Sequence, residues 1–107
     1  MAITLRSLDT TASLTDQQTA IRQAEELGFR LVSLSTARVG GGLANAVTLL
    51  QQSGAPALPV TLELVDGSLS QGAQEVALNK PDRQLVCYGS LHVNASAQNV
   101  AAWRIQA

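Results

Sequence analysis

The chain has 107 residues, which is enough for one compact domain, and 46% of them are apolar, so it can bury a core. Seven Lys and Arg stand against eight Asp and Glu, and only 14% of the residues are charged, which argues against an electrostatic nucleic-acid binder. A single Cys and a single His exclude an internal disulfide and a His/Cys zinc cluster, and no apolar run reaches the roughly 18 residues of a membrane span. No secretion-signal pattern opens the chain, so we expect a cytoplasmic protein without nucleic-acid or membrane partners.

The first predicted elements are a strand and a helix. Residues 3–8 alternate apolar and polar side chains, which is the period of a strand with one buried face. A helix is predicted from Thr15, because Thr15 and Gln18 fit a capping box, and Gly28 suits the position that ends it.

A hairpin follows the helix. Residues 29–39 and 43–52 are rich in apolar and β-branched residues and are predicted to pair as strands. Gly40-Gly41-Gly42 lies between them. A phosphate loop needs its glycines before a helix, so a hairpin turn is the first interpretation and a binding loop tip is the alternative.

The second half repeats this order with weaker signals. Residues 60–64 alternate as a strand, and residues 84–93 and 98–106 form a second hairpin. Between Ser68, which can cap a helix, and Pro81, which ends one, we expect a short helix or, in its place, a single turn or loop.

An internal duplication explains this parallel. Residues 30–52 align without a gap on residues 84–106, and the segments before them align at nearly the same shift. We therefore expect one α+β domain of two tandem βαββ repeats, residues 1–52 and 60–107, joined by a linker over residues 53–59. A unit of this size cannot bury its own apolar face, so the repeats are expected to pack about a pseudo-twofold axis. The fold would have about six mostly antiparallel strands, with both helices on one side.

Residues 26–34 resemble the centre of a small bacterial βαββ family of unknown function. Its pattern is a helix ending in Gly, then an aromatic residue, a polar residue and Leu-Val-Ser-Val. The matching residues are Gly28, Phe29, Leu31, Val32 and Ser33. The resemblance implies a βαββ fold and brings no catalytic residues with it.

Five residues of the predicted hairpins are candidate ligand contacts. Asn45 and Asn99 are identical polar residues at equivalent places, where they form either hairpin hydrogen bonds or a ligand-binding pair. Tyr88 and Trp103 belong to the core or an interface, or else to a ligand site. His92 is a solvated strand residue, a ligand contact or, as a third option, a base.

Three further residues carry possible chemistry. Asp9 and Asp66 end equivalent strands, where they make turns or, alternatively, a metal or acid–base pair. Cys87 lies within a predicted strand and is interpreted as a packed, inert thiol. We assign no catalytic residue, metal or cofactor.

These patterns favour an interaction module over an enzyme. If alternate strand residues line the core, the opposite sheet face is strongly apolar and would form an interface between copies. The predicted interface residues are Val32, Leu34, Leu50, Val86, Tyr88 and Val100. The prediction is a non-catalytic homo-oligomer; the alternatives are a small-molecule site between the repeats and, third, a hydrolase or transferase, for which no nucleophile–base pair is visible.

Overall fold

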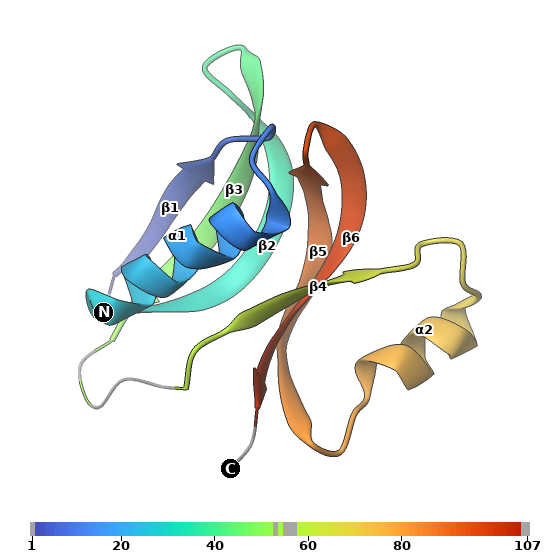
Figure 1. The fold of residues 1–107 in the computed structure, drawn as a ribbon. Coiled ribbons are helices and arrows are strands. Elements are labelled where there is room, and N and C mark those ends of the chain that lie inside the picture. The colour runs from blue at the N-terminus through green and yellow to red at the C-terminus, as the bar shows by residue number, and fades with distance from the viewer. Residues whose placement is uncertain (1, 53, 55–57, 106–107) are drawn as a thin grey trace.

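Two units with the same order of elements follow one another along the chain (Figure 1). The computed structural model describes residues 2–52, 54 and 58–105. Most of the predicted linker, residues 53 and 55–57, lies outside these residues, as do residue 1 and residues 106–107. The described elements are β1 (Ile3–Leu8), α1 (Leu14–Glu26), β2 (Phe29–Val39), β3 (Gly42–Gln51), β4 (Thr61–Val65), α2 (Gln71–Leu78), β5 (Arg83–Val93) and β6 (Ser96–Ile105).

Each unit contributes a three-stranded antiparallel sheet, and this confirms the predicted α+β fold of two βαββ units. The strand orders are β1-β3-β2 and β4-β6-β5, so the last strand of each unit lies in the middle of its sheet. Both hairpins turn through two residues with positive φ, Gly40-Gly41 and Asn94-Ala95, as the tightest hairpin turns require. The glycine run is therefore a hairpin turn.

The helices begin at serines other than the predicted caps. Ser13 caps α1 by accepting a hydrogen bond from the Asp16 amide at 3.1 Å, and Ser70 caps α2 in the same way. The predicted caps, Thr15 with its capping box and Ser68, are wrong, because several Ser and Thr residues precede each helix and each can serve as a cap. Gly28 ends the first helix with a φ of +99°, as expected.

A β-bulge interrupts the second strand of each unit at the same place. The pairing shifts at Val32 in β2 and at Val86 in β5, which are equivalent residues. The bulge turns Leu34 to the same sheet face as Leu31, opposite Val47 of β3. The predicted alternation of core-facing and outward-facing residues along this strand therefore shifts by one residue at Val32.

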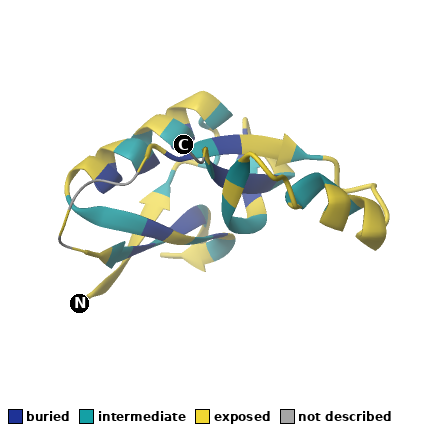
Figure 2. Cartoon of the chain, turned by 90° about the horizontal axis from the view of Figure 1, so that it is seen from below, coloured by how far each residue is buried: buried dark blue, intermediate teal, exposed yellow. Residues whose placement is uncertain are grey.

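The core lies between the two sheets and α1. Its buried members are Ile21, Ala24, Leu31, Leu34, Val47, Leu49, Val60, Leu62, Leu91, Val93, Val100 and Ala102. No residue of α2 is buried, and Figure 2 shows this helix projecting from the buried region with a mostly exposed surface.

The two units present different sheet faces to this core. The first unit contributes the face that α1 covers, which carries Val47 and Leu49. The second unit contributes Val100 and Ala102, which alternate along β6 with the residues on the side of α2. A Cβ on Gly89 of β5 would overlap the Leu34 carbonyl oxygen of β2, so these strands approach to a distance that only glycine permits.

Candidate functional site

Two buried amides of the first unit hold the backbone of a strand in the second. The Asn45 Oδ1 atom accepts a hydrogen bond from the His92 amide at 2.8 Å, and Asn45 Nδ2 donates to the His92 carbonyl at 2.8 Å. Gln17 Nε2 of α1 donates to the same carbonyl at 2.8 Å, and Asn45 Nδ2 also donates to Gln17 Oε1. We call Gln17, Thr36 and Asn45 the first slot.

The first slot binds the free edge of the second sheet. β5 is an edge strand, so half of its backbone groups have no partner within the sheet. Thr36 Oγ1 donates to the Ser90 carbonyl at 3.1 Å and lies 3.3 Å from His92 Nδ1. Beyond His92, the amides of Asn94 and Ala95 donate to carbonyls of the loop between β1 and α1.

Burial makes these bonds structurally important. Asn45 and Gln17 are almost completely buried, and a buried amide that loses its partners costs about 1–3 kcal/mol. The protein itself supplies partners to both ends of the Asn45 amide. The structure therefore places this predicted ligand contact inside the junction between the units.

The second unit has an equivalent slot with a different occupant. Gln74 corresponds to Gln17, and its Nε2 donates to the Leu69 carbonyl at 3.1 Å, as Gln17 Nε2 donates to that of Ala12. Asn99 Nδ2 donates to the Tyr88 hydroxyl at 2.9 Å, which donates to Gln74 Oε1 at 2.9 Å. We call Gln74, Ser90 and Asn99 the second slot.

The glutamines of the slots were missed from sequence. Asp9 and Asp66 align at a shift of 57 residues, and the same shift aligns Gln17 with Gln74. If the alignment is extended into the helices, it identifies Gln17 and Gln74 as equivalent residues. The hydrogen bonds between the units are not twofold-related, because Asn45 contacts the other unit whereas Asn99 contacts its own.

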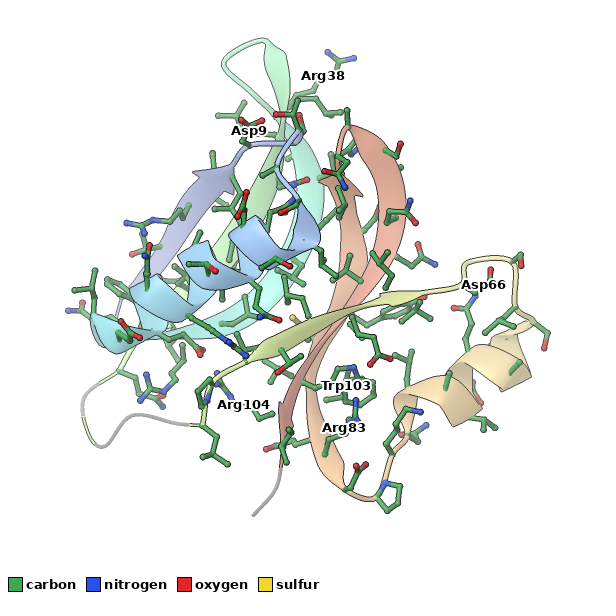
Figure 3. The ribbon with its side chains drawn as sticks, viewed as in Figure 1. Asp9, Arg38, Asp66, Arg83, Trp103 and Arg104 are labelled. Atoms are coloured by element: carbon green, nitrogen blue, oxygen red, sulfur yellow. The ribbon has the colours of Figure 1, made fainter. Side chains whose placement is uncertain are left out.

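Trp103 lies in the second sheet on the side of α2 and is almost completely buried. The Arg83 guanidinium lies 5.5 Å from the centre of its ring, within reach of a cation–π interaction, and forms an ion pair with Glu63 (Figure 3). Within the described part of the chain, the indole Nε1–H has no hydrogen-bond partner.

Asp9 and Asp66 form two separate turns. Each accepts bonds from an amide and a hydroxyl two residues on, Thr11 for Asp9 and Ser68 for Asp66. These bonds lower the pKa of both carboxyl groups. Figure 3 shows the two residues on distant loops, so the structure does not bring them together as a pair.

Cys87 lies beside an ion pair that joins the units. Arg104 of β6 donates hydrogen bonds to the Glu25 carboxylate of α1 from both terminal guanidinium nitrogens, with Nη1 at 2.9 Å. The same carboxylate accepts a hydrogen bond from the Leu31 amide at 3.0 Å. Burial raises the pKa of the Cys87 thiol to about 11, and the opposing charge effects of Arg104 and Glu25 are smaller. The thiol is therefore protonated at neutral pH.

The predicted interface residues do not form one exposed face. Leu34 and Val100 lie in the core, and Tyr88 lies in the second slot. Leu50 and Val86 are half-buried, and Val32 is exposed at the bulge. Ile3 and Leu5 of β1 are apolar side chains that are more exposed than Val32.

An open pocket of about 400 Å³ lies elsewhere on the molecule. Its lining residues are Arg22, Leu58, Pro59, Thr61 and Ile105, none of which is a predicted site residue. Among the described residues, no three His, Cys, Asp or Glu side chains gather as metal ligands, and no helix is long and apolar enough to cross a membrane.

No family model, curated protein or solved structure matches this chain. The resemblance of residues 26–34 to a βαββ family stays a prediction.

Proposed function

We propose that this protein is a non-catalytic interaction module that associates with further copies of itself. Its contact surface is the outer face of the first sheet, defined by Ile3, Leu5, Thr48 and Leu50. Ile3 pairs with Leu50 and Leu5 with Thr48 across β1 and β3, so the four side chains share one face.

One comparison within the chain carries the proposal. Ile3 and Leu5 are 69% and 58% exposed, whereas their repeat equivalents Val60 and Leu62 are 0% and 5% exposed. Equivalent positions thus carry the same kind of side chain, and within the described part of the chain those of the second unit are covered whereas those of the first unit are not. Exposed neighbouring apolar side chains of this size are typical of a contact surface.

The edge of the first sheet supports the same conclusion. β1 is an edge strand, and its residues 3–7 are exposed. Edge strands of monomeric proteins are usually guarded by charges or prolines, and Arg6 is the one charged residue of β1. A second copy of the chain would cover both the edge and the apolar face.

Light scattering after size-exclusion chromatography tests the proposal over a concentration series. The native chain is expected to exceed the monomer mass, and Leu5→Lys to return it to the monomer, because a charge cannot be buried unpaired. Val76→Lys is the matched control, since Val76 is 77% exposed on α2 and outside the proposed surface. A native chain that stays monomeric at every concentration would refute the proposal.

A further inference from the structure

The contact between the two units is a template for contact between copies. Within one copy, the first slot binds the backbone of β5 at His92. Val60, Leu62 and Val93 of the second unit are buried in the same copy. Because the units are repeats, the second unit also carries a slot, and the first unit carries a second version of the face that docks.

The first unit exposes the residues that such docking would bury. Ile3, Leu5 and Val39 correspond to the buried Val60, Leu62 and Val93, and all three are more than 40% exposed. β1 pairs with β3 as β4 pairs with β6, and β2 has the same length as β5, with its bulge at the equivalent residue. The docking face is therefore present twice, once covered and once open.

The second unit retains the groups that bind a strand. Gln74 and Asn99 stand where Gln17 and Asn45 hold the His92 backbone, and Gln74 is anchored to its loop in the same way. The Tyr88 hydroxyl bridges the two amides, in the position that a strand backbone has in the first slot. Side chains of α2 around this slot are only partly buried, which leaves the helix free to adjust.

Two residue differences between the repeats make the contact between copies weaker than the contact between the units of one chain. Tyr88 stands in place of Leu34, so its hydroxyl must leave the two amides before a strand can enter. Ser35 stands in place of Gly89, whose missing Cβ allows the closest approach of the units. Both differences hinder docking without removing a binding group, which gives a reversible and concentration-dependent contact.

We propose that copies associate head to tail, with the second slot of one copy holding β2 and the outer face of the next copy's first unit. This inference rests on the proposed self-association and names the surface that the outer face meets. Such a contact joins unlike surfaces, so it leads to chains or closed rings rather than to a twofold dimer.

Complementation between two defective variants tests this arrangement. Leu5→Lys disables the docking face and leaves the slot intact. Asn99→Asp disables the slot, because its carboxylate repels the strand carbonyl that Asn45 Nδ2 binds in the first slot. The Tyr88 hydroxyl, which accepts from Asn99 Nδ2 in the native chain, can rotate to donate to this carboxylate. Each variant alone is expected to be monomeric, and an equimolar mixture is expected to form a dimer.

A twofold dimer through the outer faces gives the opposite pattern. Asn99→Asp would then associate like the native chain, and mixing would not rescue Leu5→Lys. Either result overturns the head-to-tail arrangement while leaving the proposed self-association in place. A native chain that is always monomeric refutes both proposals.

A second experiment makes the proposed contact between copies resemble the contact between the two units of one chain. Tyr88→Leu and Ser35→Gly each give the second contact the residue of the first, and each should lower the dissociation constant between copies about tenfold. Ser35→Gly keeps the test valid if Tyr88→Leu impairs folding, since Ser35 is exposed on β2. An unchanged or larger dissociation constant in sedimentation equilibrium for Ser35→Gly overturns the inference.

Discussion

Asn45 and Asn99 illustrate how one neighbouring residue decides the role of an amide. Both occupy the same place in their units, yet Asn45 binds a strand of the other unit and Asn99 binds a tyrosine of its own. The difference follows from one pair of equivalent residues, which is Leu34 in the first unit and Tyr88 in the second. A phenol reaches the amides, whereas a leucine leaves their hydrogen-bonding groups to a backbone.

Cys87 gives a prediction at this scale. Burial raises the pKa of this thiol from its ordinary 9.0 to about 11, so at a pH between these values the thiol is protonated in the folded chain and largely ionised in the unfolded chain. Its contribution to stability is complete below about pH 9 and is lost as pH rises through about 11. Chemical denaturation at several pH values should show this loss in the native chain and less of it in Cys87→Ser, which carries the residue of the first unit at that position.

Alkylation provides an independent check on the same thiol. The native protein should react with iodoacetamide at pH 7 more slowly than the unfolded chain, because thiolate is the reacting form. Equal rates in the two states would contradict the protonated, half-buried thiol.

At the scale of elements, the two helices differ although their units are repeats. α1 runs for 13 residues and buries Ile21 and Ala24, whereas α2 runs for 8 residues and buries none. The second unit has three residues fewer between the serine that caps its helix and the strand that follows, and Pro81 lies within that shorter segment, so α2 is shorter than α1. The longer helix can therefore reach the start of β4, and its Arg22 Nε donates to the carbonyl of Val60, the residue before that strand, at 2.7 Å.

Hydrogen exchange should separate these helices. A helix without buried residues opens locally at low free-energy cost, so the amides of α2 are expected to exchange faster than those of α1. Mass spectrometry of peptides covering each helix measures the difference. Protection of α2 equal to that of α1, in a sample shown to be monomeric, would contradict this prediction.

Sequence patterns predicted the elements well because most of them have one buried face. Strand alternation and the duplication placed six strands and two helices in order. The caps were misplaced by two residues, since several serines and threonines compete at each helix start. The bulges were missed because the apolar run around Val32 gives no sign of which residue is extra.

The slots were harder to predict because they join distant residues. Gln17 and His92 are 75 positions apart, and the bond between them uses the His92 backbone, which any residue would supply. Periodicity shows which face of a strand is apolar but not which unit covers it. The choice between the two faces of β6 depends on packing of the whole chain.

At the scale of the whole molecule, the junction depends on the close contact at Gly89. Gly89→Ala should destabilise the fold by about 3 kcal/mol, because the added Cβ would overlap the Leu34 carbonyl and push the sheets apart. Gly72→Ala is the matched control, since nothing lies within 4 Å of its Cβ position in α2, and it should stabilise by about 1 kcal/mol. Urea unfolding of both variants measures these changes, and a Gly89→Ala protein as stable as the native chain would contradict the close contact.

The bond between Gln17 and His92 also affects how the chain folds during synthesis. All residues of the first unit have been added by position 52, but the strand that fills its slot ends at Val93. Until then Ile21, Leu34 and Val47 lack the partners that bury them in the finished protein. The nascent chain therefore carries an unfinished core through more than a third of its translation, and folding of the first unit is completed only when the second emerges.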